Sequence, residues 1–209
     1  MARPLTPAAF ATAADVSRET LARLEAYAAL LAKWQARINL VGGATLADLW
    51  RRHMLDSAQL HRLLPAQARV LVDLGSGAGF PGLVLAAMGV PEVHLIEADA
   101  RKCAFLREAA RVMGVAVTVH NRRIAEVAPF AADVVTARAL APLRELLVLA
   151  APFLGPDTMC LFLKGRGVED ELTEAAKDWT IHAEMIASLS DPLGSILRIG
   201  EVKRGRATA

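Results

Sequence analysis

The residues that most constrain the fold of this chain form a glycine-rich segment at positions 70–82, with the sequence VLVDLGSGAGFPG. A valine-rich apolar run carries one carboxylate, Asp73, and is followed by three glycines at alternate positions, Gly75, Gly77 and Gly79, and then by Pro81. Proline is tolerated in the first turn of a helix because the N–H group that it lacks has no partner there. The pattern therefore predicts a strand that turns sharply into a helix, with backbone N–H groups open to a ligand.

Two classes of nucleotide site fit this turn. Read from Gly77 to Gly82, it matches the dinucleotide fingerprint, in which a pyrophosphate lies at the helix N-terminus. Read from Asp73 to Gly79, it matches the turn of methyltransferases that use S-adenosylmethionine (SAM). The second reading fits better, because the strand already ends at Gly75, where a dinucleotide site would have its first glycine. SAM also has no pyrophosphate, and Asp73 is a suitable anchor for its ammonium group.

A second acid lies at the end of the next expected strand. Residues 93–97 read as a strand that ends in Glu97. Glu97 follows the glycine turn by about 20 residues, the spacing of an acid that accepts hydrogen bonds from ribose hydroxyls. Asp99 is a weaker candidate, and we expect it to cap a helix that begins near Ala100.

The composition fits one large domain, or one domain with an appendage. Of the 209 residues, 54% are hydrophobic, and the formal net charge is +2. The two cysteines, Cys103 and Cys160, form neither a metal-binding pattern nor a disulfide framework. The N-terminus lacks the apolar core of a signal peptide, and the longest apolar run, residues 146–154, is too short to span a bilayer. We therefore expect a monomeric cytoplasmic protein with no metal and no membrane partner.

Hydrophobic periodicity divides the chain into two parts. Residues 1–64 are expected to form an N-terminal helical extension, in which apolar residues recur at helical spacing and Gly42-Gly43 interrupts the helices. Residues 65–209, in which strand and helix patterns alternate, are expected to form one SAM-dependent methyltransferase domain. The expected strands are 69–74, 92–97, 115–120, 133–137, 158–164, 180–189 and 195–203. The expected helices of this domain are 81–88, 100–113, 123–127, 142–152 and 168–178.

This alternation predicts an α/β fold of the Rossmann-like class I methyltransferase type, with a seven-stranded, mostly parallel sheet and helices on both faces. Residues 191–194 (DPLG) predict a turn between the last two strands. A closing antiparallel hairpin of this kind is typical of methyltransferase sheets, whereas a dinucleotide-binding domain has no need of one.

The loop after the fourth strand, residues 136–139, bears on the chemistry, because ligands of open parallel sheets bind at the carboxyl ends of strands. It holds Arg138 but neither the Asn/Asp-Pro-Pro-aromatic motif of amine methyltransferases nor the Pro-Cys nucleophile of enzymes that methylate pyrimidine carbons. Asp191-Pro192 slightly resembles the amine motif, but we expect it in the final hairpin, remote from the site. The acceptor is therefore expected to be an atom with a ready lone pair, such as a purine ring nitrogen, with alignment supplying much of the rate.

Arg138 has two interpretations. Its guanidinium can donate hydrogen bonds to guanine O6 or to the SAM carboxylate, or it can be a structural arginine paired with a neighbouring acid. Basic residues also gather at loop and strand ends around the predicted site, where they fit phosphate contacts better than scattered surface charge does. The clusters are Arg51-Arg52, Arg101-Lys102, Arg122-Arg123, Lys164 with Arg166, and Lys203-Arg204 with Arg206.

Several segments together resemble the ribosomal RNA small-subunit methyltransferase G family, also called glucose-inhibited division protein B. The resemblance covers about residues 25–170, and it is the combination of segments, not the glycine turn alone, that is specific. The segments are 34–40 (WQARINL), 52–57 (RHMLDS), 73–82 (DLGSGAGFPG), Arg101-Lys102 with Phe105-Leu106, Arg138-Ala139, and 163–165 (LKG).

The resemblance implies SAM-dependent methylation of N7 of one guanine in the decoding-region loop of 16S rRNA, by direct in-line transfer without a covalent enzyme intermediate. Arg138 would be the catalytic residue, reaching the cofactor or the target base, and backbone groups of Ile124 and Ala125 would frame the adenine. The expected cofactor-binding residues are Asp73, Gly75, Gly77, Gly79, Phe80, Glu97, Ile124, Ala125 and Arg138. The expected contacts to substrate RNA are Arg52, His53, Arg101, Lys102, Arg123 and Lys164.

Other readings remain open at this point. His53 and Asp56 lie one helical turn apart and belong either to the substrate side or to the packing of the N-terminal helices. A small-molecule methyltransferase would act without RNA and would have no use for the basic clusters. A non-catalytic RNA-binding factor would not need Asp73, three glycines and Glu97 together. An NAD-dependent oxidoreductase with a Tyr-x-x-x-Lys motif is excluded, because Tyr27 is the only tyrosine.

Overall fold

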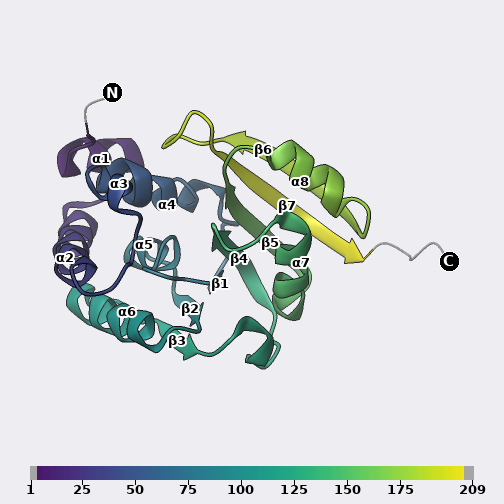
Figure 1. Cartoon of the computed structure of the whole chain (residues 1–209), viewed down its shortest axis with the longest axis horizontal. Helices are drawn as coiled ribbons and strands as arrows, with labels where there is room; N and C mark the ends of the chain where they lie inside the picture. The colour runs from purple at the N-terminus through teal and green to yellow at the C-terminus, as the bar shows by residue number, and fades with distance from the viewer. Residues whose placement is uncertain (1–3, 205–209) are drawn as a thin grey trace.

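The computed structural model describes residues 4–204, so Arg206 of the last basic cluster lies outside the described residues. A single seven-stranded sheet crosses the molecule in the order β3-β2-β1-β4-β5-β7-β6 (Figure 1). Strands β1 to β5 run parallel, and β7 lies antiparallel between β5 and β6. The predicted sheet with its closing antiparallel hairpin is thus confirmed. The strands are β1 Val70–Leu74, β2 Glu92–Glu97, β3 Thr118–Asn121, β4 Ala132–Arg138, β5 Leu154–Lys164, β6 Trp179–Ala187 and β7 Ser195–Arg204.

Helices cover both faces of the sheet. One face carries α5 and α6 together with the N-terminal helices, and the other carries α7 and α8 (Figure 1). None of the helices within residues 4–204 is long and apolar enough to cross a bilayer. The α-helices are α1 Pro7–Ala14, α2 Arg18–Gln35, α3 Gly43–Leu46, α4 Asp56–Ala58, α5 Gly82–Ala87, α6 Ala100–Met113, α7 Leu143–Ala150 and α8 Val168–Ala175. Shorter turns are the π-helix η1 Trp50–Leu55 and the 3₁₀-helices η2 His61–Leu63, η3 Ile124–Glu126 and η4 Ala151–Phe153.

The N-terminal segment (residues 4–64) shares its core with the sheet domain. Tyr27 of α2 is fully buried, and its ring packs 5.2 Å from the ring of Phe80 in the glycine turn and 6.1 Å from that of Phe105 in α6. The Tyr27 hydroxyl donates a hydrogen bond to the backbone carbonyl of Ala78. Burial of large aromatic side chains is a main source of core stability. The helical extension therefore supports the turn from behind.

Three strand boundaries differ from the predicted ones by two residues or more, each for a local reason. Strand β3 begins three residues late, because Gly114 ends α6 in a left-handed conformation and the Val115 N–H bonds back to the helix. Strand β5 begins four residues early, where Leu154 pairs with Ala132 across a register shift. Strand β6 ends at Ala187 rather than at 189, because the chain there turns toward the N-terminal segment.

The segment around His53 is a π-helix instead of an ordinary α-helix. The Asp56 N–H donates to the carbonyl of Arg51, five residues earlier, which is the hydrogen bond that defines a π turn. Such turns recur at functional sites because they change the direction of a few side chains within a helix. Here the turn carries Arg52, His53 and Asp56 on the side that faces the glycine-rich turn.

Candidate functional site

The carboxyl ends of the parallel strands open on a cavity of about 1170 Å³. Single small-molecule sites are typically about 300–1,000 Å³, so this cavity has room for a cofactor and part of a second ligand. Most of the predicted site residues line it: Gly75, Gly77, Phe80, Glu97, Ile124, Ala125, Arg138, Arg52, His53, Lys102, Arg123 and Lys164. Three predicted residues, Asp73, Gly79 and Arg101, do not line it.

The glycine turn forms one wall of the cavity. Gly75 adopts φ +63°, which is unfavourable for a residue with a side chain, and a Cβ atom there would come within 2.6 Å of Leu140 Cδ1. Beside it, the Gly77 N–H donates to Glu97 Oε2 over 2.9 Å. Leu140 therefore lies against Gly75 and Glu97 holds the Gly77 N–H, and the two glycines border the cavity without side chains of their own.

Asp73 lies behind this turn, which corrects its expected position. Its side chain is fully buried and accepts hydrogen bonds from Thr136 Oγ1 at 2.9 Å and from the Gly82 N–H at 3.3 Å. A Cβ atom on Gly82 would lie only 2.9 Å from Asp73 Oδ2, so this close approach requires glycine. Burial raises the pKa of Asp73 to about 6, against the lowering effect of its hydrogen bonds. Asp73 positions the turn from behind and is not exposed to the cavity as an anchor for an ammonium group.

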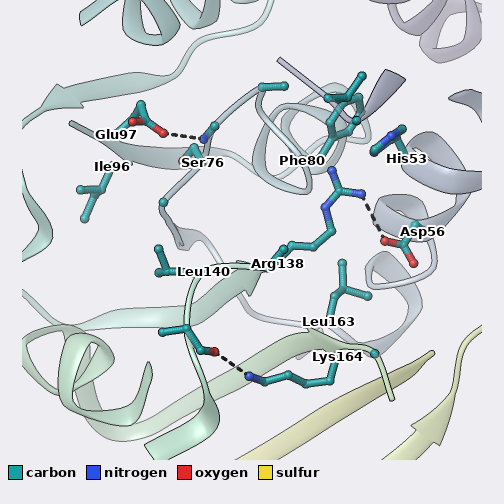
Figure 2. Close-up of a pocket in the computed structure, with 18 of the residues that line it drawn as sticks. His53, Asp56, Ser76, Phe80, Ile96, Glu97, Arg138, Leu140, Leu163 and Lys164 are labelled. Carbon is teal, nitrogen blue, oxygen red and sulfur yellow. Dashed lines mark hydrogen bonds and ion pairs between the residues drawn. The ribbon is translucent and has the colours of Figure 1, made fainter. Parts of the chain in front are cut away.

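Glu97 joins the glycine turn to the end of β2. Its Oε2 atom accepts from Gly77 N (Figure 2), and its Oε1 atom accepts from Asp99 N at 2.8 Å. Each carboxylate oxygen can accept a further hydrogen bond, so Glu97 retains the capacity to bind two hydroxyl groups. Asp99 caps α6 by accepting from the N–H groups of Arg101 and Lys102, as the sequence predicted.

Apolar side chains border the cavity beside Glu97. Ile96 at the end of β2, Ile124 of η3 and Leu140 after β4 contribute apolar surface there. Figure 2 shows Ile96 near Glu97 and Leu140 across from the glycine turn. If a planar ring were bound between these side chains, a ribose attached to it would lie beside Glu97. This arrangement fits an adenosine.

Arg138 extends from the end of β4 toward the N-terminal segment. Its Nη1 atom donates to Asp56 Oδ2 at 3.3 Å and to the backbone carbonyl of Arg52 at 3.2 Å. The guanidinium carbon lies 5.0 Å from the centroid of the Phe80 ring, within the range of a cation–π interaction. The pairing with an acid that the sequence left open is therefore present. Within residues 4–204, Nη2 and Nε of Arg138 have no hydrogen-bond partner and remain available as donors.

His53 is a buried, neutral histidine in the cavity wall. Its ring lies 5.0 Å from the Phe80 ring, and its Nε2 atom is 2.7 Å from Thr45 Oγ1. Because the Thr45 hydroxyl donates its proton to the Gly42 carbonyl, both contacts are satisfied when His53 carries its proton on Nε2. Burial, with Arg138 and Arg52 nearby, lowers the pKa of His53 to about 3. His53 packs against the turn and bears no positive charge for RNA at neutral pH.

Lys164 also has a different environment from the one expected of an RNA contact. Its ammonium group donates to the Ala141 carbonyl at 2.8 Å (Figure 2) and to Glu171 Oε2 at 2.6 Å, and its side chain is only 8% exposed. Glu171 also accepts from the Leu143 N–H at 2.7 Å. Lys164 therefore holds the loop after β4 in place, and its charge is neutralised within the protein.

The basic groups that border the cavity are fewer than the sequence suggested. We call Arg52, Lys102, Arg122 and Arg123 the basic rim, since all four line the cavity. Arg101 is 73% exposed and pairs with Asp99 outside it. The remaining members of the predicted clusters within the described residues, Arg51, Arg166, Lys203 and Arg204, do not line it either.

The final hairpin is not remote from the site, which corrects another expectation. Asp191 in the β6–β7 loop (residues 188–194) lines the cavity and lies 2.5 Å from Arg52 Nη1. Ser190 of the same loop donates to Asp56 Oδ1 at 2.5 Å. Sequence reasoning missed Ser190, placed Asp191 away from the site and left the role of Asp56 open. The available signal was topological: β7 begins at Ser195, beside Lys164 at the end of β5, so its preceding turn lies at the same edge as the site.

Comparison with known proteins identifies the family to which this chain belongs. The family model described as rRNA small subunit methyltransferase G matches residues 20–193. The chain belongs to this family. Ribosomal RNA small subunit methyltransferase G of Paramagnetospirillum magneticum is 65% identical over 96% of this chain and 98% of its own length. The protein of the same name from Rhodospirillum rubrum is 62% identical over 96% of this chain and 100% of its own length.

Solved structures extend the comparison to the fold. A TehB-like SAM-dependent methyltransferase from Corynebacterium glutamicum superposes with a TM-score of 0.56 at 15% identity, covering 86% of this chain and 98% of the other. TYW2 of M. jannaschii, solved in complex with AdoMet, gives a TM-score of 0.57 at 16% identity, covering 81% and 80%. These likenesses confirm the predicted class I methyltransferase fold. Because the chain belongs to the rRNA small subunit methyltransferase G family, it is a methyltransferase.

Proposed function

We propose that this enzyme transfers the methyl group of SAM to N7 of one guanine in the decoding-region loop of 16S rRNA, in the small ribosomal subunit. The observation that carries this proposal is the position of Arg138, at the end of β4 between the glycine turn and the N-terminal segment. Two of its guanidinium nitrogens have no hydrogen-bond acceptor among the described residues, 4–204. Arginine donors recognise the O6 edge of guanine, which lies beside N7. The family match supports rRNA as the substrate.

The residues present fit SAM as the methyl donor. The side-chain-free turn at Gly75 and Gly77, the carboxylate of Glu97 and the apolar side chains of Ile96, Ile124 and Leu140 provide for its amino acid, ribose and adenine parts respectively. SAM supplies an electrophilic methyl group on a sulfonium ion. Glu97 would accept from the ribose hydroxyls, and backbone atoms at Ile124 and Ala125 would frame the adenine. In this assignment Asp73 and Gly79 shape the turn without contacting the cofactor.

The chemistry needs neither a general base nor a covalent intermediate. The N7 lone pair forms the new N–C bond while the C–S bond breaks, and its electron pair moves to sulfur, so that the positive charge passes from sulfur to the methylated ring. No proton leaves N7. Both cysteines are fully buried, and burial raises the pKa of Cys160 to about 12, so neither is available as a nucleophile. The protein contributes mainly alignment of the three reacting atoms.

We assign fewer residues to RNA binding than the sequence predicted. We assign phosphate contacts to the basic rim and leave out Lys164, whose charge is neutralised by Glu171, and Arg101, which pairs with Asp99 outside the cavity. His53 supports the ring of Phe80 instead of contacting phosphate. All the residues assigned above to the cofactor and to RNA come from one chain, and we propose that the enzyme acts as a monomer, in the cytoplasm, where its substrate is assembled.

The test uses small ribosomal subunits from a strain that lacks this activity. The purified protein is incubated with them and with methyl-labelled SAM, and N7-methylguanine is mapped by borohydride–aniline cleavage. We expect one discrete cleavage in 16S rRNA, and none with the Gly75→Asp variant. Label confined to small molecules, or no label in RNA although SAM binds, would refute the proposal.

A further inference from the structure

The β6–β7 loop forms part of the cavity wall opposite the glycine turn. Its residues Ser188, Ser190, Asp191 and Gly194 line the cavity. The loop reaches this place because β7 runs antiparallel to β5, so that Ser195 pairs with Lys164 at the carboxyl edge of the sheet. A segment near the end of the chain thus borders the space where a substrate nucleotide would enter.

Three hydrogen bonds that do not involve Asp191 fasten this loop to the N-terminal segment. Gln59 accepts from the Leu189 N–H at 2.7 Å and donates to Ser188 Oγ at 3.1 Å. Ser190 donates to Asp56. Because these three contacts join side chains and backbone that are at least partly buried, they fix the position of the loop.

Asp191 is held differently, in a pair that stabilises the fold little. Its Oδ2 atom lies 2.5 Å from Arg52 Nη1, and the two side chains are 31% and 40% exposed. Exposed ion pairs of this kind contribute little to stability. The Leu193 N–H donates to Asp191 Oδ1 at 3.0 Å, and this hydrogen bond together with Arg52 lowers the pKa of the carboxyl, so Asp191 is negatively charged at neutral pH.

Arg52 is the member of the basic rim nearest to Arg138, whose Nη1 atom bonds to the Arg52 carbonyl. A phosphate of RNA whose guanine lies beside Arg138 would come close to this guanidinium. Carboxylate and phosphate oxygens bind the guanidinium of arginine in the same way, through charge-assisted hydrogen bonds. Asp191 therefore occupies the position on Arg52 that a phosphate would take.

We propose that Asp191 is an internal competitor for RNA, a carboxylate that a phosphate must displace from Arg52 before the target guanine is bound. The inference rests on the proposed function, since it takes RNA as the substrate. RNA that also fits the cavity and the rest of the basic rim displaces Asp191, whereas RNA held only by its backbone charge does so poorly. The pair thus lowers the affinity for both kinds of RNA by no more than the free energy of one exposed ion pair, and target RNA offsets this cost through its contacts in the cavity.

The experiment measures binding of poly(U), which contains no guanine, over a range of salt concentrations, and methylation of small subunits by the same proteins. Asp191→Asn is compared with Asp157→Asn, which removes one exposed charge at the opposite end of β5. We expect Asp191→Asn to bind poly(U) about fivefold more tightly than wild type, as removal of an exposed ion pair allows. The logarithmic salt slope should become steeper by about 0.7, the value for one more phosphate contact on a single strand. Asp157→Asn should change neither quantity appreciably.

A double-mutant cycle shows whether Arg52 carries the effect. In an Arg52→Gln background, Asp191→Asn should no longer change poly(U) affinity. Equal poly(U) affinity of Asp191→Asn and Asp157→Asn would overturn the proposal. So would a loss of SAM affinity in Arg52→Gln with unchanged RNA affinity, because Arg52 would then bind the cofactor carboxylate. Absence of methylation of the subunits by the wild type would instead refute the proposed function, while the poly(U) measurements would still report on the pair. Circular dichroism and thermal unfolding check that each variant is folded.

Discussion

The guanidinium of Arg138 at the end of β4 lies 3.3 Å from the carboxylate of Asp56, which comes 82 positions earlier in the chain. Both side chains are largely shielded, with 19% and 16% exposed. The same carboxylate accepts from Ser190 and from Gln59. Asp56 therefore links the N-terminal segment, the arginine of the site and the β6–β7 loop, and it orients Arg138 over the Phe80 ring.

Replacing Asp56 by Asn tests this orienting role. Asparagine keeps an oxygen acceptor for Ser190 and Gln59 but removes the charge that holds Arg138. We expect kcat to fall by about tenfold to a hundredfold, the loss that a displacement of about 1 Å can cause, while the KM for SAM changes little. Steady-state kinetics with small subunits measures both. Asp178→Asn, which removes the exposed partner of Arg144, serves as the control and should behave as wild type. A fall in SAM affinity without a fall in kcat would contradict the assignment.

Replacing Gly75 by Ala tests the glycine turn. The new Cβ would lie 2.6 Å from Leu140 Cδ1 in a left-handed backbone conformation, so the wall of the cavity must shift. We expect SAM affinity to fall at least tenfold in calorimetric titration, and the free energy of unfolding to fall by about 1–3 kcal/mol. Gly89→Ala is the matched control, because Gly89 also has a positive φ of +105° but open space around its Cβ position. It should lose stability and keep its SAM affinity; equal SAM losses in both variants would show that backbone strain alone is responsible.

The sequence predicted those parts of the site that local pattern determines. The glycine turn, Glu97 at the end of β2 and Arg138 after β4 are each adjacent in sequence to the strand that positions them, so strand order and the rule for parallel sheets suffice. The partners of these residues could not be predicted in this way. Asp56 and Asp191 reach Arg138 and Arg52 through contacts between segments that are 82 and 139 positions apart. The hydrophobic periodicity of a sequence does not indicate which distant segments come into contact.

Burial changed the interpretation of three other residues. Asp73, His53 and Lys164 are polar residues in the sequence motifs that were expected at the site. Their charge or polarity favoured the prediction that they contact ligands. In the structure each is enclosed, and its hydrogen bonds go to protein atoms. Whether a polar side chain faces a cavity or lies behind its wall depends on tertiary packing, which a single sequence does not specify.

The pH dependence of stability should show opposite contributions from His53 and Asp73. The pKa of His53 is about 3 in the folded protein and 6.5 in the unfolded chain, so its contribution to stability falls as the pH drops below 6.5. The pKa of Asp73 is about 6 when folded and 3.8 when unfolded, so its contribution rises as the pH drops through that interval. Between about pH 4 and 6 the two slopes, each up to about 1.4 kcal/mol per pH unit, nearly cancel.

Single variants should separate these contributions. Relative to wild type, Asp73→Asn should become progressively less stable as the pH falls from 6 to 4, because only His53 remains. His53→Gln should become progressively more stable over the same interval. Urea unfolding at pH 4, 5 and 6 gives the free energies, and only the difference between variant and wild type at each pH is interpreted. Differences that do not vary with pH would contradict the assigned protonation states.

Replacing Lys164 by Gln distinguishes a structural lysine from an RNA contact. The variant loses the ion pair with Glu171 and the hydrogen bond to Ala141, so the loop that carries Leu140 loosens and methylation slows. Its free energy of unfolding should fall by about 1–3 kcal/mol, as expected when buried polar partners are left unpaired. The salt dependence of RNA binding should stay that of the wild type, because the ammonium is already neutralised within the protein. Arg123→Gln, which removes a member of the basic rim, is the positive control and should reduce the logarithmic slope by about 0.7. A reduction of the same size in Lys164→Gln would mean that the lysine leaves Glu171 and binds phosphate when RNA is present.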